Sequence, residues 1–280
     1  MENNPQNEPA KQNDRPFKKL ANILGDGKMT TQQKEGFLEE MSDKIFVNYD
    51  FVSAKTYEAI FKRLVVQEGN IALVGAGYPF DAGGYSNVTK ALEKIETPTH
   101  VIPVDILQKR AESWLLLDKN PKDGQKETSI ISPIVADATM LPFVNNSISG
   151  YISANLINEP RKEEKEITFV KKMIGEAYRT LMPGGFIILS SFGYFKYTKQ
   201  GGAVTYNDYI EQENMILPEE VQAIMKEAGF NKVEELPLDH ELILEAVKKK
   251  KLQLALQKRE PEDIIVAVNL VDPCAYLAIK

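Results

Sequence analysis

Apolar residues along the chain follow two alternating patterns, short and mostly apolar runs and longer stretches with helical spacing. Mostly apolar runs are typical of strands buried on both faces, and they occupy residues 71–74, 100–104, 129–135, 150–154 and 186–191. Helical spacing occupies residues 86–94, 107–117, 162–181, 218–229 and 241–258. Because strands and helices alternate, the pattern predicts a mostly parallel sheet with right-handed crossovers and helices on both faces.

Two further strands are predicted at residues 232–236 and 275–279. The expected fold is therefore a Rossmann-like, doubly wound α/β fold with a seven-stranded sheet. Residues 263–270 fit a strand or a helix. The buried face of the helix at 162–181 is expected to carry Ile167, Val170, Ile174 and Tyr178.

The start of the strand pattern near residue 68 divides the chain into three parts. Residues 1–16 are polar and are expected to be a disordered tail, and residues 17–67 are expected to form a helical cap. Residues 68–280 then form the α/β domain, with a lid insertion at 194–217 and a helical insertion at 241–270.

The composition excludes several classes of function. With 34 basic and 40 acidic residues, the formal net charge is −6, and no sustained Lys/Arg face is present, so nucleic acid is not expected as the main partner. One cysteine and two histidines argue against a disulfide framework or a zinc site. No apolar stretch approaches the roughly 20 residues of a membrane span, and no signal peptide is evident. We expect a cytoplasmic protein.

Glycines and polar residues end the predicted strands. The first strand runs into Gly75-Ala76-Gly77, where glycine lets a ligand approach the backbone. The next three strands end at Asp105, Asp137 and Asn155. Because parallel strands end at one edge of a sheet, these residues are expected to lie together at a site for a nucleotide-like cofactor.

Five sequence blocks resemble class I S-adenosylmethionine-dependent methyltransferases, in particular the branch that methylates small molecules. The resemblance covers about residues 68–236, and its blocks are VGAG at 74–77, PVDI at 103–106, ADATMLPF at 136–143, AYRTLMPGGFIILS at 177–190 and MKEAGF at 225–230. The third and fourth blocks are the most specific. The resemblance implies S-adenosylmethionine as cofactor and a small molecule as the methyl acceptor, with in-line displacement as the reaction.

The resemblance also implies roles for individual residues. Asp105 would accept hydrogen bonds from the ribose hydroxyls, Asp137 would accept one from the adenine amino group, and the Ala138 N–H would donate to a ring nitrogen. The residues assigned to cofactor binding are Gly75, Ala76, Gly77, Asp105, Ile106, Asp137, Ala138, Asn155 and Leu156. Met140 and Leu141 either flank the adenine or belong to the core.

The acceptor pocket is expected between the N-terminal helices and the lid insertion. Its candidate residues are Tyr49, Asn158, Tyr206 and Tyr209. Glu159 either contacts the acceptor or places a negative charge at the start of the next helix. No residue is identified as a general base, and neither the acceptor nor the oligomeric state follows from the sequence.

The first glycine motif departs from the family pattern. Leu73 stands where the family has an acidic residue, Pro79 stands where it has the third glycine, and Asp81 in the inserted loop is either a replacement carboxylate or a turn former. One alternative is therefore a non-catalytic relative that acts as a binding or interaction protein. The other is a nicotinamide or flavin oxidoreductase. That reading requires glycine in place of Phe80 and a shorter interval from Gly77 to Asp105, about 20 residues.

Overall fold

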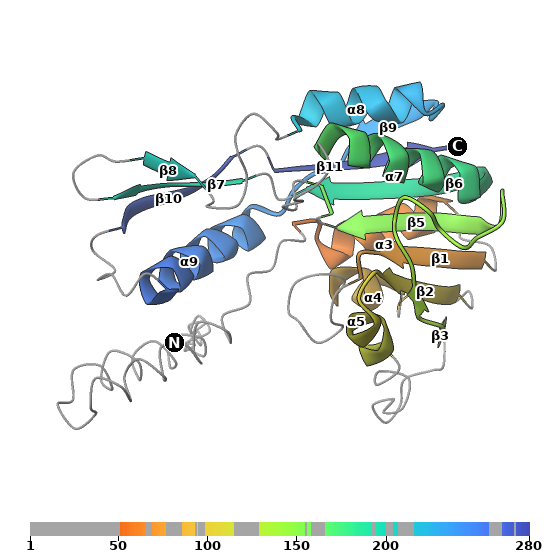
Figure 1. Cartoon of the computed structure of the whole chain (residues 1–280), viewed down its shortest axis with the longest axis horizontal. Coiled ribbons are helices and arrows are strands. Elements are labelled where there is room, and N and C mark those ends of the chain that lie inside the picture. Colours follow the sequence, from red (N-terminus) through yellow and green to blue (C-terminus); the bar gives the residue numbers. More distant parts are fainter. Residues whose placement is uncertain are drawn as a thin grey trace, which may run out of the picture.

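The computed structural model describes residues 51–64, 69–76, 86–92, 94, 99–114, 129–154, 156–157, 166–191, 194–199, 204–206, 216–257, 265–271 and 273–280. These residues form a large sheet with helices on both faces. A small sheet extends from the large one with α9 (His240–Gln257) beside it (Figure 1).

The large sheet has the strand order β3-β2-β1-β5-β6-β11-β9, and β4 also pairs with β2. Strands β1 to β6 pair in parallel, whereas β11 is antiparallel to both of its neighbours. The bounds are β1 Gly69–Val74, β2 Thr99–Asp105, β3 Ser129–Ile131, β4 Ile134–Val135, β5 Ile148–Ala154, β6 Leu181–Ser191, β9 Lys232–Glu235 and β11 Cys274–Ile279. This arrangement confirms the predicted Rossmann-like, mostly parallel sheet.

The third predicted strand is divided in two. Ser132 and Pro133 separate β3 from β4, because proline has no N–H with which to continue a ladder. Both pieces pair with β2, so together they fill the single position that was expected for residues 129–135. The seven predicted strand positions are therefore all present.

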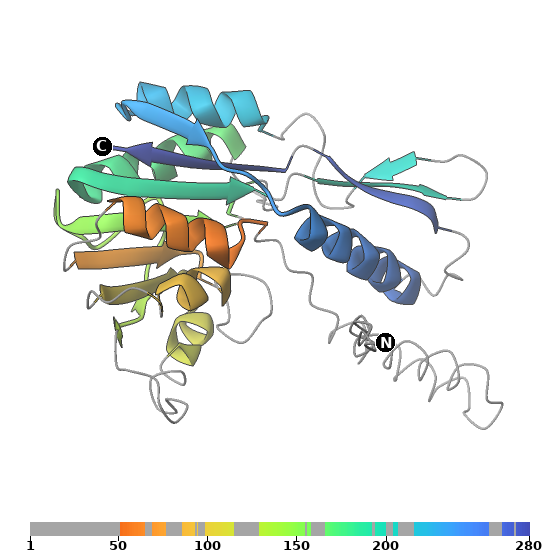
Figure 2. The ribbon, with the colours of Figure 1, turned by 180° about the vertical axis from the view of Figure 1, so that it is seen from behind.

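Helices cover both faces of the sheet, as Figures 1 and 2 show from opposite sides. One face packs against α7 (Glu166–Thr180) and α8 (Pro218–Glu227), through buried side chains such as Val170, Ile174 and Met225. The other face packs against α3 (Ala54–Leu64) and α4 (Ser86–Leu92), through Tyr57, Phe61 and Val88. The short α5 (Gln108–Ser113) follows β2.

The buried face of α7 differs in part from the prediction. Val170 and Ile174 are fully buried, but Ile167 is 38% exposed, and Phe169 is buried in the first turn instead. The helix also ends at Thr180, before Pro183, and β6 begins at the next residue. The Lys280 ammonium caps this helix end, since its Nζ donates to the carbonyl oxygens of Tyr178 and Leu181 at 2.6 and 2.7 Å.

The segments outside the large sheet refine the expected domain map. Of the predicted helical cap, the structure describes residues 51–64, in which α3 packs directly on the sheet; the predicted tail at 1–16 lies outside the described residues. Strands β7 (Tyr194–Lys199), β8 (Val204–Tyr206) and β10 (Ile265–Val271) form an antiparallel sheet in the order β10-β7-β8. The expected lid thus contains β7 and β8, and the expected helical insertion contains α9 followed by a strand.

None of the helices that the structure describes is long and apolar enough to cross a membrane.

Candidate functional site

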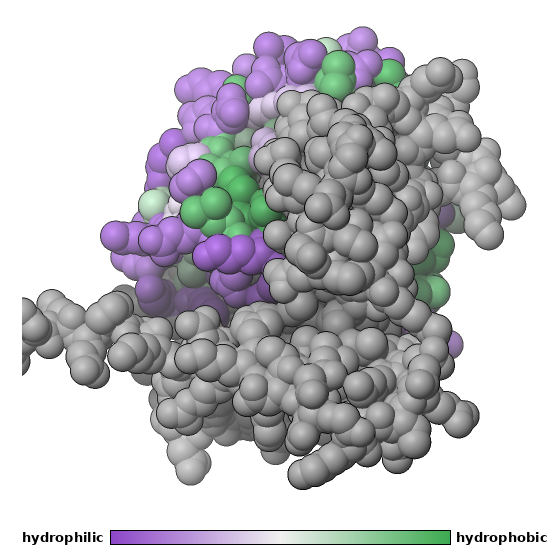
Figure 3. Space-filling view, turned by 90° about the vertical axis from the view of Figure 1, so that its left-hand side faces the viewer, coloured by the Kyte–Doolittle hydropathy of each residue, from purple (hydrophilic) through white to green (hydrophobic). Residues whose placement is uncertain are grey.

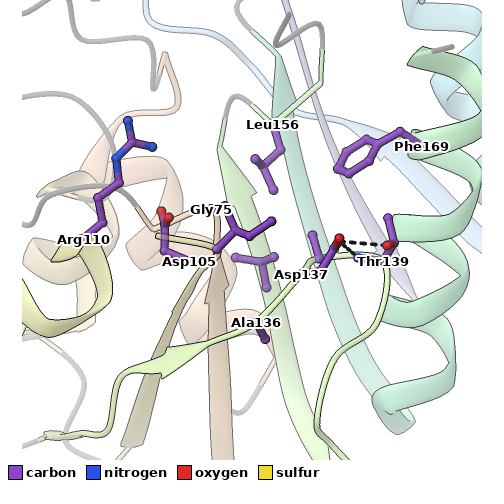
Figure 4. Close-up of a pocket in the computed structure, with 11 residues that line it drawn as sticks. Gly75, Asp105, Arg110, Ala136, Asp137, Thr139, Leu156 and Phe169 are labelled. Carbon is purple, nitrogen blue, oxygen red and sulfur yellow. Dashed lines mark hydrogen bonds between the residues drawn. The ribbon is translucent and has the colours of Figure 1, made fainter. Parts of the chain in front are cut away.

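The carboxyl ends of β1, β2 and β5 meet at one edge of the large sheet. Figure 3 shows the molecule from the side toward which these strands run, and on that face apolar side chains gather in a patch that polar side chains border. At the edge formed by the strand ends lies a pocket of about 330 Å³, at the low end of the roughly 300–1,000 Å³ that small-molecule sites occupy. The described residues that line it are Val74, Gly75, Asp105, Ile106, Arg110, Ala136, Asp137, Ala138, Thr139, Leu156 and Phe169 (Figure 4).

Gly75 forms the wall of the pocket at the end of β1. Its φ of +72° lies in the left-handed region that favours glycine. The N–H groups of Gly75 and Ala76 both donate to the carbonyl oxygen of Val104, at 2.8 and 3.0 Å, which holds the turn against β2. A Cβ on Gly75 would lie only 2.5 Å from Cγ of Leu156. The glycine therefore allows Leu156 to approach the backbone closely, whereas the Ala76 side chain is buried in the core.

Asp105 ends β2 and is only 3% exposed. Its Oδ1 accepts a hydrogen bond from the Leu107 N–H at 2.9 Å, and a carboxylate can accept further bonds beside this one. Arg110 lies in α5, and its side chain is on the same side of the pocket as the Asp105 carboxylate (Figure 4). This corner of the pocket thus combines an anionic acceptor with a cationic donor.

Asp137 is the second residue of the loop that follows β4. Its Oδ1 accepts hydrogen bonds from the N–H and the hydroxyl of Thr139, at 2.7 and 2.8 Å (Figure 4). Both bonds use the same oxygen, so they orient the carboxylate while Oδ2 takes no part in them. The Ala136 N–H donates to the Asp105 carbonyl oxygen at 3.1 Å. The two strand ends that carry the carboxylates are therefore joined directly.

Two residues of α7 hold the rest of this loop. Oε2 of Glu176 accepts from the Leu141 N–H at 2.9 Å, and Arg179 donates to the carbonyl oxygens of Leu141 and Phe143 at 3.0 and 2.8 Å. The two side chains also bind each other, with Nε and an NH2 group of Arg179 each 2.8 Å from a Glu176 oxygen. The hydrogen bond from Arg179 holds the pKa of Glu176 below its usual value.

The sequence left open whether Met140 and Leu141 flank a base or belong to the core, and the structure distinguishes the two residues. Leu141 is 4% exposed and belongs to the core, whereas Met140, which follows the pocket-lining Thr139 in the sequence, is 76% exposed. Only Met140 remains a candidate for flanking a flat ligand.

Several predicted site residues cannot be placed. Gly77, Asn155, Tyr49, Asn158, Tyr209 and also Glu159 lie outside the described residues. Tyr206 ends β8 in the small sheet, and only its backbone is described. The predicted residues that the structure brings together are Gly75, Asp105, Ile106, Asp137, Ala138 and Leu156.

Sequence reasoning missed Arg110, Thr139 and Phe169, which also line the pocket. The position of Arg110 could have been predicted from the sequence, because the first turn of a helix that follows β2 must lie near the carboxyl edge of the sheet. Thr139 was inside a recognised block, and a hydroxyl two residues after an aspartate is a common turn partner. Nothing in the sequence indicates that Phe169 lines the pocket, since an aromatic residue on an amphipathic helix usually belongs to the core. Among the residues that the structure describes, no group of three His, Cys, Asp or Glu is placed to hold a metal ion.

No protein-family model matches the chain, and neither does the sequence of any curated protein. Solved structures do match. Phosphoethanolamine N-methyltransferase 2 of Haemonchus contortus, in complex with phosphomonomethylethanolamine and S-adenosylhomocysteine, has a TM-score of 0.53 and 18% identity, over 89% of this chain and 58% of that one. The same protein with S-adenosyl-L-methionine has a TM-score of 0.52 and 15% identity, over 93% and 60%.

The CurJ carbon methyltransferase is a third similar structure, with a TM-score of 0.51 and 14% identity, over 95% of this chain and 65% of that one. The chain therefore spans about three fifths of the length of these proteins. A dinucleotide-binding sheet has the all-parallel order 3-2-1-4-5-6, whereas here the antiparallel β11 lies between β6 and β9. The chain has the fold of a class I S-adenosylmethionine-dependent methyltransferase.

Proposed function

We propose that this protein is an S-adenosylmethionine-dependent methyltransferase that acts on a small-molecule acceptor. One observation carries the proposal: Asp105 and Asp137 stand at neighbouring strand ends on either side of a pocket that Gly75 closes with its backbone. A ligand with one ribose and one adenine can use two such acceptors. The three similar structures support the choice, since all are methyltransferases and the Haemonchus protein holds S-adenosyl-L-methionine or S-adenosylhomocysteine.

The hydrogen-bonding and apolar groups of the pocket fit this cofactor. Asp105 is buried at the end of β2 and suits the two hydroxyls of a ribose, because a carboxylate accepts from both at once. Oδ2 of Asp137 would accept from the adenine amino group, and the Ala138 N–H would donate to a ring nitrogen. The apolar side chains of Ile106 and Phe169 line the pocket and would contact the faces of the base.

When bound, the cofactor supplies an electrophilic methyl group on a sulfonium. The part of the protein is to hold the acceptor in line with that group and to exclude water, so positioning is its main contribution to the rate. Leu156 follows β5 and packs against Gly75, which places an apolar wall where the donor and acceptor would meet. We assign no general base.

A transfer assay tests the proposal. The protein would be incubated with S-adenosylmethionine and a panel of small amines, phenols and carboxylic acids, and the S-adenosylhomocysteine formed would be quantified. We expect turnover with at least one acceptor class and, at a sub-saturating S-adenosylmethionine concentration, about thirtyfold slower turnover by the Asp105→Ala variant. Binding of the cofactor without any acceptor-dependent product would contradict the catalytic part of the proposal.

A non-catalytic binding or interaction protein is the second candidate, because the first motif departs from the family. Leu73 is fully buried in the core, at the position where the resemblance implies a carboxylate for the amino-acid part of the cofactor. This candidate predicts that no methyl transfer occurs, whether S-adenosylhomocysteine binds or not. The transfer assay therefore separates the two.

The acceptor is expected to bind between the N-terminal helices and the segment of residues 194–217, which contains β7 and β8. Replacing Tyr206 and Tyr209 with alanine should raise the KM for the acceptor and leave the affinity for S-adenosylhomocysteine unchanged. Steady-state kinetics and calorimetry on the same variant measure both. Loss of both affinities together would show that the tyrosines support the fold and not the acceptor.

A further inference from the structure

The loop that follows β4 carries two of the proposed adenine contacts, Asp137 and Ala138, but it has no regular secondary structure from residue 136 to residue 147. A loop of this kind gains a defined position only from interactions with rigid neighbours. Near its start it is ordered by the hydrogen bonds between Asp137 and Thr139. Further along, the side chains that form hydrogen bonds with residues 141, 143 and 145 come from α7.

Glu176 and Arg179 bind the loop at its backbone. Leu141 is held at both polar atoms, because its N–H donates to Glu176 and its carbonyl oxygen accepts from Arg179. Arg179 also donates to the carbonyl oxygen of Phe143 and, at 2.8 Å, to Oδ1 of Asn145. The planar guanidinium reaches all of these acceptors and Glu176 together, which a lysine ammonium cannot do.

A second ion pair on the same helix shows what an ordinary surface pair looks like. Lys171 and Glu227 join α7 to α8 at 3.0 Å with side chains that are 51% and 65% exposed. The Arg179 and Glu176 side chains are 34% and 18% exposed, and they engage loop backbone in addition to each other. Exposed pairs contribute little, whereas bonds from charged groups to otherwise unsatisfied backbone atoms contribute more.

We propose that Glu176 and Arg179 are positioning residues that hold the 137–145 loop in the shape required for adenine binding. The inference deepens the proposed function and rests on it. Neither residue lines the pocket among the described residues, so both act through the loop. The consequence is that a change on α7 alters cofactor affinity without removing any cofactor contact.

The test uses Arg179→Lys, which keeps the charge but not the fork of donors, and Glu176→Gln, which keeps the shape. Lys171→Ala is the matched control on the same helix. Amide hydrogen exchange of the unliganded protein would report on residues 137–145, and calorimetry would report the affinity for S-adenosylhomocysteine. We expect both variants to exchange at Leu141 about tenfold faster and to bind about tenfold more weakly, the scale of one charged hydrogen bond. The control should match the wild type in both measurements.

Hydrogen exchange and calorimetry together distinguish a failure of the positioning role from a failure of the proposed function. Unchanged exchange and unchanged affinity in both variants, beside a wild type that binds, would overturn the positioning role alone. Faster exchange in the loop with unchanged affinity would overturn the link to the adenine site. A wild type that does not bind would overturn the proposed function and this inference with it. If Arg179→Lys fails to fold, Glu176→Gln decides, because it keeps the shape of the side chain but removes its charge and replaces one of its two acceptor oxygens with an amide donor.

Discussion

Replacing Asp105 with alanine is expected to weaken S-adenosylhomocysteine binding by about 2 kcal/mol, roughly thirtyfold in Kd. The carboxylate is buried at the end of β2 and lines the pocket. Two ribose hydroxyls bound there would donate hydrogen bonds to this charged group. Isothermal titration calorimetry measures the change directly. An affinity equal to that of the wild type would remove Asp105 from the site.

The control for this variant is Asp239→Ala. Asp239 makes the same kind of local bond, since its Oδ1 accepts from the Glu241 N–H at 3.0 Å as Oδ1 of Asp105 accepts from Leu107. It stands before α9 and does not line the pocket among the described residues. We expect Asp239→Ala to lower the free energy of unfolding by about 1 kcal/mol, as the loss of a helix cap does, and to leave the cofactor affinity unchanged.

Replacing Gly75 with alanine is expected to have the second large effect, on stability and binding together. The φ of +72° costs a non-glycine residue of order 1–3 kcal/mol, and the new Cβ would overlap the Leu156 side chain, which must then move within the pocket wall. Urea unfolding and calorimetry should show a lower free energy of unfolding and a weaker affinity for S-adenosylhomocysteine.

Gly175→Ala is the matched control for the glycine. It lies in α7, and a Cβ there would meet no described atom within 4 Å apart from its chain neighbours and the adjacent backbone of its own helix. Because alanine is the better helix former, this variant should be more stable by up to about 1 kcal/mol. A double variant, Gly75→Ala with Leu156→Ala, should recover the part of the loss that comes from the overlap. Equal stability of Gly75→Ala and Gly175→Ala would contradict the account of the glycine turn.

The sequence predicts the central sheet well because its strands are buried on both faces and so read as mostly apolar runs. It could not predict that β11 runs antiparallel between β6 and β9, since pairing direction depends on contacts between distant segments. The small sheet was missed for the same reason, because β7 and β10 pair across more than sixty intervening residues, from Lys199 to Ile265. The proline at 133 explains the division of β3 from β4, and this signal was present in the sequence.

The candidate site was predictable where it is built from strand ends. Asp105 and Asp137 follow apolar runs, and parallel pairing alone brings them to one edge. The contributions of α5 and α7 were not predictable, because the direction of a side chain such as Arg110 or Phe169 depends on how its helix packs. The same holds for Glu176 and Arg179, whose spacing by itself indicates only a helical ion pair.

Calorimetric titration of the wild-type protein tests the central claim, that the pocket at the carboxyl edge takes an adenosyl cofactor. S-adenosylhomocysteine, NAD and FAD would be titrated separately under the same conditions, with thermal unfolding as a second readout. The account predicts binding of S-adenosylhomocysteine in the micromolar range with one site per chain, and no binding of either dinucleotide. The absence of both heat and a thermal shift with S-adenosylhomocysteine, or tighter binding of a dinucleotide, would contradict it.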